Sequence, residues 1–172
     1  MTRSEFLQQL EWGKEGEKEI CNLLAEQGES FMALYQFEDD IAPKIMGAEG
    51  DIISPDIIRF SNGRAYFAEV KRKTQWVKGW SVSGEIETGL NNKHFLEYVK
   101  TSKITGLDVE IYFIQEEMAP LGIWKYTIKP NYNGEDCNDE LQSRRIGDNF
   151  DRRTGKNVKM TYFRIGSLQK IK

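Results

Sequence analysis

The chain has 172 residues, of which 39% are hydrophobic, 12% aromatic and 30% charged, and its net charge is −3. This length and composition predict one globular domain over residues 1–172 and argue against a mostly disordered chain. No apolar run approaches the roughly 20 residues of a membrane span, and the polar start lacks the apolar core of a secretory signal, so we expect a cytoplasmic protein with no membrane partner.

Charge and cysteine content narrow the function classes. The net negative charge counts against a strongly basic nucleic-acid binder, because lysine and arginine supply most non-specific affinity for phosphate. Basic residues do gather in Lys71–Lys78 and in Arg144–Lys159. Cys21 and Cys137 form no CxxC pair and His94 is the only histidine, which excludes zinc sites built from these residues. A Cys–His nucleophile would require Cys21 and His94 to meet.

The first predicted element is a long amphipathic helix from Ser4 to about Gln27, with Gly28 as its stop. Its inward stripe has spacings of three and four residues and consists of Phe6, Leu10, Gly13, Glu17, Ile20 and Leu24. Glu17 replaces an apolar residue in this stripe. An inward acid needs a partner, which favours a ligand or a water-positioning group. The alternative is a boundary glutamate with its carboxylate in water.

A strand is predicted over Ser30 to Phe37, followed by an acidic loop and then by a β-hairpin. The hairpin turn is Asn62-Gly63, because both residues tolerate the positive φ that a two-residue turn requires. This turn pairs Ser61 with Arg64 and, five residues farther along the ladder, places Asp56 opposite Glu69.

Lys71 shares a sheet face with Glu69, since side chains alternate along a strand. Asp51 is the rival acid, but the same register would place it opposite Thr74, away from the other groups. Two opposed carboxylates destabilise a hairpin unless a cation removes the conflict. Mg²⁺ prefers such oxygen ligands, and an adjacent ammonium steadies developing charge. A chance surface cluster is the competing interpretation.

The segment after the hairpin mixes cations with aromatic rings, as nucleic-acid contacts often do. Lys73, Gln75, Trp76 and Lys78 are its candidate contact residues, with Gln75 placed to meet a phosphate or a water. An ordinary strand exit with buried tryptophans is an equal alternative.

A second helix is predicted from Asn91 to about Ser102, with an asparagine cap. His94 and Tyr98 are four residues apart and share a face, and Lys93 is a further candidate for phosphate contact. A surface histidine and a core tyrosine are the alternative.

Two strands follow, at Val109 to Gln115 and Gly122 to Lys129. The helix between the hairpin and Val109 makes a crossover, so we expect an α/β fold with a mixed central sheet flanked by helices. The polar stretch from Asn131 to Lys159 predicts a solvated loop of unassigned role, and Met160 to Ile165 a closing strand.

Pro55-Asp56 followed, across a hairpin turn, by Glu69-Val70-Lys71 resembles the signature of the PD-(D/E)xK nuclease superfamily. The resemblance covers roughly Gly13 to Gln115 and implies a restriction-endonuclease-like αβββαβ core. Gly13-Lys14-Glu15-Gly16-Glu17 is similar to the first-helix pattern of small Holliday junction resolvase-like nucleases, in which a glutamate reaches the metal. His94 and Tyr98 loosely resemble a Gln-x-x-x-Tyr element of RecB-type members, with histidine in place of glutamine.

The predicted function is therefore Mg²⁺-dependent hydrolysis of DNA phosphodiester bonds in recombination, repair or phage DNA processing, with Mn²⁺ as a substitute metal. Asp56, Glu69, the carbonyl of Val70 and Glu17 are the predicted metal ligands, and Lys71 is predicted to orient water and offset charge. DNA is the expected partner, and the resemblance makes a homodimer an option. The alternatives are a non-cleaving nucleic-acid-binding protein on the same fold and a structural subunit of an assembly.

Overall fold

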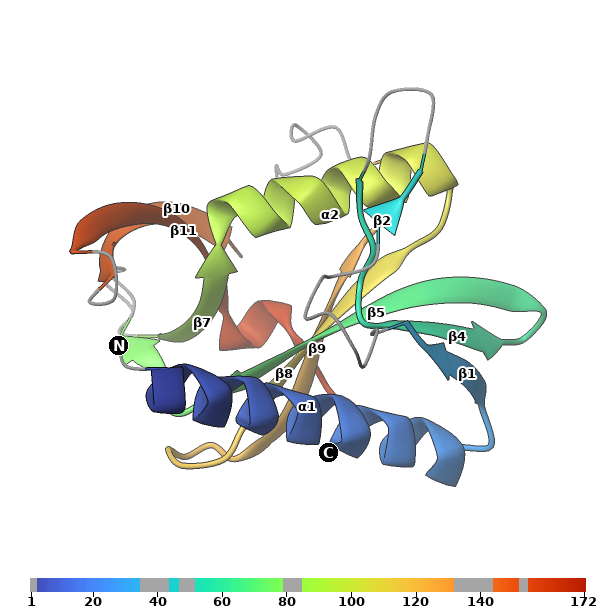
Figure 1. Cartoon of the computed structure of the whole chain (residues 1–172), viewed down its shortest axis with the longest axis horizontal. Helices are drawn as coiled ribbons and strands as arrows, with labels where there is room; N and C mark the ends of the chain where they lie inside the picture. Colours follow the sequence, from blue (N-terminus) through green and yellow to red (C-terminus); the bar gives the residue numbers. More distant parts are fainter. Residues whose placement is uncertain (1–2, 35–43, 47–51, 79–84, 132–143, 152–154) are drawn as a thin grey trace.

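The computed structural model describes residues 3–34, 44–46, 52–78, 85–131, 144–151 and 155–172. A six-stranded sheet lies between two helices, so the predicted mixed central sheet with flanking helices is confirmed (Figure 1). None of the described helices is long and apolar enough to cross a membrane. Across the sheet, the strands are β1 (Ser30–Ala33), β4 (Ile57–Ser61), β5 (Arg64–Lys73), β8 (Val109–Gln115), β9 (Gly122–Ile128) and β12 (Gln169–Lys170).

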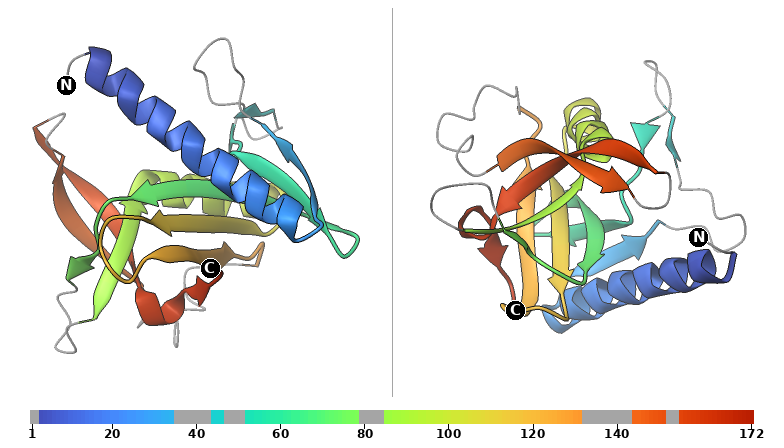
Figure 2. Two further views of the ribbon diagram at one scale, coloured as in Figure 1. Left: turned by 90° about the horizontal axis from the view of Figure 1, so that it is seen from below. Right: turned by 90° about the vertical axis from the view of Figure 1, so that its left-hand side faces the viewer.

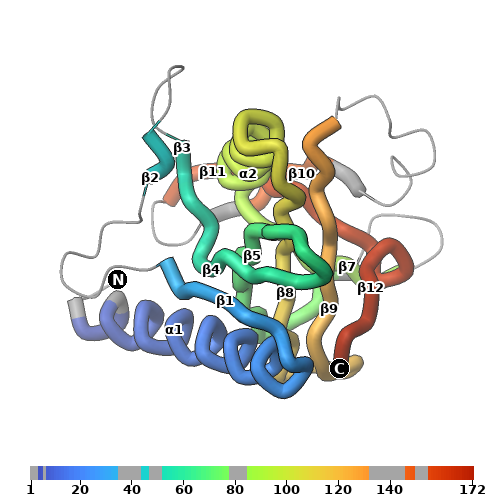
Figure 3. Tube along the Cα trace, turned by 90° about the vertical axis from the view of Figure 1, so that its right-hand side faces the viewer, coloured from blue at the N-terminus to red at the C-terminus, as the bar shows by residue number. Residues whose placement is uncertain are grey.

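Strand directions follow from the connections. β5 and β8 are parallel and are joined through a helical crossover, whereas the other neighbours in the sheet are antiparallel. Helix α1 (Arg3–Glu26) covers one face and helix α2 (Asn92–Thr105) the other, as the end-on trace shows (Figure 3). Successive residues of β5 divide between two cores: Phe67 packs on the α2 side, and Ala68 and Val70 pack on the α1 side.

Helix α1 confirms the predicted inward stripe in its second half. Ile20 and Leu24 are fully buried against the sheet. Gly28 ends the helix with φ 73°, and its N–H donates to the carbonyl of Ala25 at 3.0 Å. The predicted stop is therefore correct, because glycine adopts this left-handed conformation without a Cβ penalty.

Helix α2 begins at its predicted asparagine cap. The side chain of Asn91 accepts a hydrogen bond from the backbone N–H of Lys93 at 2.9 Å. The helix continues to Thr105, beyond the predicted end at Ser102, because the left-handed residue that terminates it is Gly106 (φ 71°).

The β4–β5 hairpin has the predicted register. Asn62 and Gly63 form the turn, with φ 51° and 73°, and the ladder runs from Ser61↔Arg64 to Ile57↔Ala68. Asp56 lies at a bend one residue before β4 begins. Beyond Ala68, β5 therefore continues without β4 alongside it, which leaves backbone groups on that edge for side chains to contact.

Other predicted strands are confirmed in part. β1 covers Ser30–Ala33, whereas residues 35–37 of the predicted strand lie outside the described residues, as does Asp51. β8 and β9 occupy the two strands predicted after the second helix. A short two-stranded sheet pairs β2 (Lys44–Ile45) with β3 (Ile52–Ile53).

The prediction of a solvated loop over Asn131–Lys159 is wrong for its second part. β10 (Arg144–Asp151) and β11 (Lys156–Arg164) form a hairpin, with Gly155 at φ 65° before β11. β11 in turn pairs with β7 (Ile86–Asn91), which pairs with β6 (Val77–Lys78). The polar composition concealed these strands, whose backbones pair with each other and with β7. Among the side chains of β10 and β11 that the structure describes, the buried ones lie near the end of β11. A 3₁₀ turn (Ile165–Ser167) leads on to β12.

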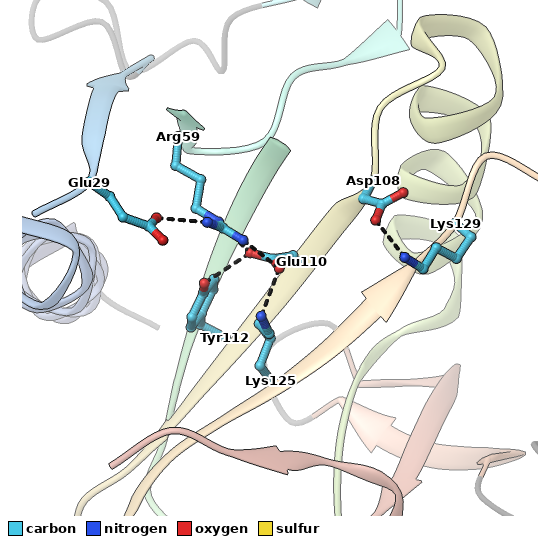
Figure 4. A network of polar contacts seen from close by, with 7 residues as sticks. All are labelled: Glu29, Arg59, Asp108, Glu110, Tyr112, Lys125 and Lys129. Atoms are coloured by element: carbon cyan, nitrogen blue, oxygen red, sulfur yellow. Dashed lines mark hydrogen bonds and ion pairs between the residues drawn. The ribbon is translucent and has the colours of Figure 1, made fainter. Parts of the chain in front are cut away.

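The sheet also contains a buried ion network, made up of Glu29, Arg59, Glu110, Tyr112 and Lys125 (Figure 4). Arg59 donates to both carboxylate oxygens of Glu110, at 2.6 and 2.8 Å, and to Glu29 at 2.7 Å. Tyr112 and Lys125 also donate to Glu110, at 2.9 and 2.7 Å.

Candidate active site

Asp56 is fixed at the start of β4 by both its backbone and its side chain. Its carbonyl accepts a hydrogen bond from the N–H of Leu34 at 2.8 Å. Its Oδ2 accepts from the backbone N–H of Val70 at 2.8 Å. This N–H is on the part of β5 that extends beyond Ile57, the first residue of β4. Because β4 begins only at Ile57, the Asp56 carboxyl can reach the second half of β5.

Glu69 projects from β5 on the α2 side of the sheet and is only 3% exposed. Lys71, two residues along the same strand, contacts its Oε1 directly. Tyr98 on α2 hydrogen bonds to the same carboxylate and is itself buried. A lysine from the strand and a tyrosine from the helix thus hold Glu69, whereas the sequence had suggested nucleic-acid contact for Tyr98.

Glu17 reaches this region from α1. Its Oε2 is buried and has no hydrogen-bond partner among the described residues. Burial and the charge of Glu69 raise the pKa of the Glu17 carboxyl, while Lys71 opposes the shift. The inward position predicted from the helical stripe therefore does bring Glu17 within electrostatic range of the hairpin residues. Glu17, Asp56 and Glu69 are called the acid cluster below.

The acid cluster carries more negative charge than its surroundings neutralise. Burial, followed by the charge of Glu69, raises the pKa of Asp56 well above its usual range. Burial alone would lower the pKa of Lys71, but Glu69 and Asp56 outweigh it and raise that pKa. Lys71 is thus an ammonium facing two carboxyls, and the site retains a preference for further positive charge.

Lys73 and His94, two more of the predicted residues, lie near Lys71. Burial and the Lys71 charge lower the pKa of Lys73 to about 8. Burial and the same lysine lower the pKa of His94, although Glu69 acts in the opposite direction. Both side chains line the same cavity as Asp56 and Lys71.

The remaining predicted contact residues are dispersed. Gln75 and Lys93 are exposed, and the side chain of Lys78 lies outside the described residues. Trp76 is a core residue, 5% exposed, whose ring packs edge-on against Trp124 at 5.0 Å. Its indole N–H donates to the carbonyl of Pro120 at 3.0 Å, so the structure places this indole in the core and not in the cavity.

Sequence reasoning did not anticipate the role of Arg72. Its guanidinium donates to the Trp12 carbonyl at 2.7 Å and to Glu15 at 2.8 Å, and it also pairs with Glu116. It lies over the Trp12 ring, 4.8 Å from the centroid. The Arg72 side chain passes so close to α1 that a Cβ at Gly16 would lie 2.5 Å from its Cγ. The sequence signal was a glycine inside a long helix, which indicates close approach of another group.

Asp56, Glu17 and Lys71 line one groove of about 1120 Å³, whose walls are α1, the end of β5, the start of α2 and the β10–β11 hairpin. Figure 2 shows α1 and the hairpin as two arms on the same side of the molecule. Asp56, Glu17 and Lys71 lie along this groove, so these two acids of the cluster are accessible to a ligand that enters between the arms, while Glu69 is buried behind Lys71.

The donor chemistry of the cluster suits a hard divalent cation. Carboxylate and carbonyl oxygens are the ligands that Mg²⁺ prefers, and the unpaired Oε2 of Glu17 supplies one that nothing else satisfies. Among the described residues, no three acidic, histidine or cysteine side chains are already gathered closely enough to hold an ion. The residues fit a metal in donor type and in charge.

No protein-family model matches the chain, and no curated protein matches it. Among solved structures, it is similar to Hjc, a Holliday junction resolvase from the archaeal hyperthermophile Archaeoglobus fulgidus. The two chains are 14% identical, each is covered over 86% of its length, and the TM-score is 0.47.

Proposed function

We propose that the chain is a divalent-metal-dependent nuclease of the PD-(D/E)xK type that hydrolyses DNA phosphodiester bonds. One observation carries the proposal: the hairpin brings Asp56, Glu69 and Lys71 together at a groove, with the unpaired carboxylate oxygen of Glu17 beside them. Buried acids with raised pKa values in a cleft mark functional sites more often than structural ones.

Asp56, Glu69 and the carbonyl of Val70 would hold the metal, with Glu17 as a further ligand. Mg²⁺ is the proposed ion, and Mn²⁺ would substitute for it. When bound, the ion supplies Lewis-acid stabilisation of the phosphate, which is worth several kcal/mol. The raised pKa of Asp56 would fall on loading, because a nearby positive charge favours the carboxylate.

The protein's own groups do the positioning. Tyr98 donates to Glu69 and fixes the orientation of its carboxylate. The Lys71 ammonium, held against Glu69, is proposed to donate to a phosphate oxygen as charge develops there. In the reaction, the oxygen of water bonds to phosphorus, the bond from phosphorus to the leaving oxygen breaks, and a proton passes to that oxygen.

A plasmid nicking and linearisation assay with Mg²⁺ or Mn²⁺ tests the proposal. We expect Asp56→Asn and Lys71→Ala each to reduce the cleavage rate by roughly 100-fold or more, the usual loss when one charge-stabilising group is removed. The matched controls are Asp108→Asn and Lys129→Ala, which remove the same residue types from a partly exposed ion pair of 2.8 Å. These controls should cleave at the wild-type rate.

Three other results would each contradict the mechanism in a different way. Cleavage that persists in both site variants would show that Asp56 and Lys71 are not needed. DNA binding without cleavage by the wild type would identify a non-cleaving nucleic-acid-binding protein. Absence of both would favour a structural subunit.

A further inference from the structure

The groove beside the acid cluster has an uneven distribution of charge. Its lining includes lysine or arginine only on one stretch of β5, namely Lys71, Arg72 and Lys73, as far as the structure describes the chain. Arg72 is already paired with Glu15 and Glu116. Among the described residues, Lys71 pairs with Glu69 alone, so two of the three N–H donors of its ammonium are left for a ligand. Lys71 and Lys73 lie on the same face of a single strand, because side chains alternate along it.

A single line of cations matches a single phosphate backbone. Duplex DNA presents two backbones, and a protein that holds a duplex commonly neutralises phosphates on both with lysine and arginine. The α1 side and the β10–β11 side of this groove contribute no such residue within the described lining.

The two walls of the groove, α1 and the β10–β11 hairpin, present aromatic, amide and apolar groups of the kind that contact bases. Trp12 lines the groove from α1, and Arg72 covers one face of its ring. Aromatic rings stack on unpaired bases with little regard to sequence. The other lining groups of the arms include neutral amides and apolar side chains: Gln8, Gln9, Asn149, Val158 and Met160. Amides donate and accept hydrogen bonds at exposed base edges.

We propose that the groove binds one unpaired DNA strand, with its backbone along Lys71 and Lys73 and its bases between α1 and the β10–β11 hairpin. This inference rests on the proposed function and assigns its substrate class, which is DNA with a single-stranded segment at the scissile phosphate. It also assigns a role to the β10–β11 hairpin, as the wall of the groove across from α1 (Figure 2).

Fluorescence anisotropy with a labelled 20-mer oligonucleotide, single-stranded or annealed as a blunt duplex, tests the inference on the full chain without Mg²⁺ or Mn²⁺. We expect the wild type to bind the single strand at least about tenfold more tightly than the duplex. Trp12→Ala should weaken single-strand binding roughly tenfold, within the range that stacking of one base supplies. Trp12→Phe, which keeps a ring, should restore most of the loss.

Because Trp12 also packs on Arg72, a second variant leaves that contact intact. Gln8 and Asn149 are exposed and lie on opposite arms, so the double substitution Gln8→Ala with Asn149→Ala spares the core. It should weaken single-strand binding severalfold and change duplex binding less than twofold. Lys129→Ala, in a partly exposed ion pair, serves as the control.

The outcomes separate this inference from the nuclease proposal. Equal affinity for single strand and duplex, or equal effects of the variants on both, would overturn the single-strand groove even if the protein cleaves plasmid through Lys71. Trp12-dependent binding of single strands by a protein that cleaves nothing would support the groove and overturn the nuclease. Absence of single-strand binding would overturn the groove, while the plasmid assay with Mg²⁺ or Mn²⁺ would still decide the nuclease proposal.

Discussion

The chain builds two clusters of buried charge on the same sheet, and they are balanced in opposite ways. In the buried ion network, Arg59 and Lys125 both donate to Glu110, whose pKa is lowered although burial alone would raise it. In the acid cluster, burial and the mutual repulsion of the carboxylates outweigh the attraction of Lys71, so the pKa values of Asp56 and Glu17 are raised. The number of acids is similar. What differs is whether the protein supplies enough cations to neutralise them.

We infer that this contrast distinguishes a structural cluster from a proposed metal site. A network in which both oxygens of the central carboxylate, Glu110, are hydrogen bonded gains nothing from a further ion, and its loss should appear as lost stability. A cluster with an unpaired carboxylate oxygen on Glu17 costs stability until something positive arrives. The two clusters should therefore respond in opposite directions to substitution and to metal.

The largest expected effect is in the buried ion network. Glu110→Gln should lower the free energy of unfolding by about 3–5 kcal/mol, because it leaves Arg59 and Lys125 buried without their carboxylate. Urea denaturation measures the change. Asp108→Asn, in a partly exposed ion pair with Lys129, is the control and should cost less than about 1 kcal/mol. Equal costs for both variants would show that the network is no more than a surface pair.

Metal should act only on the acid cluster. Mg²⁺ at 100 times its dissociation constant should stabilise the wild type by about 2.7 kcal/mol, since it binds the folded chain alone. Thermal unfolding with and without EDTA measures the shift. Asp56→Asn should lose most of it, whereas Asp108→Asn should keep it. An undiminished shift in Asp56→Asn would place the ion elsewhere.

The smallest effect is a gain in stability without metal. The pKa of Asp56 in the folded chain lies above its unfolded value of 3.8. Ionisation of Asp56 therefore destabilises the fold as the pH rises from 3.8 through the folded pKa. Asp56→Asn should therefore raise the melting temperature at pH 7 by roughly 2–4 °C, equivalent to about 1 kcal/mol. The gain should shrink as the pH falls toward 3.8. A variant less stable than the wild type at pH 7 would mean that the Asp56 charge is already compensated.

Local signals predicted the half of the site that comes from the hairpin. Asn62-Gly63 fixed the register because the turn and its two strands are adjacent in sequence, and the ladder confirms it as far as Ile57↔Ala68. The helical stripe predicted that Glu17 points inward, for the same reason of short spacing. The roles of these residues in metal binding and catalysis remain predictions.

Long-range contacts could not be predicted in this way. Arg59 and Glu110 are 51 residues apart, and nothing in the sequence pattern of Val109–Gln115 indicates that Glu110 is buried among cations. The contact of Tyr98 with Glu69 and that of Arg72 with α1 likewise depend on how helices pack on the sheet. The β10–β11 hairpin was missed because its polar strands lack the apolar alternation on which strand prediction depends.

The absence of a side chain at Gly16 sets the thickness of the layer between α1 and β5. The Arg72 side chain fills that layer and is anchored at its far end by Glu15 and Glu116, so it has little freedom to yield. A methyl group at position 16 would push the helix outward and carry the neighbouring Glu17 away from the strands. One missing carbon atom thus acts as a spacer that sets how far the helix-borne carboxylate reaches into the site, independently of the hairpin that positions the other two acids.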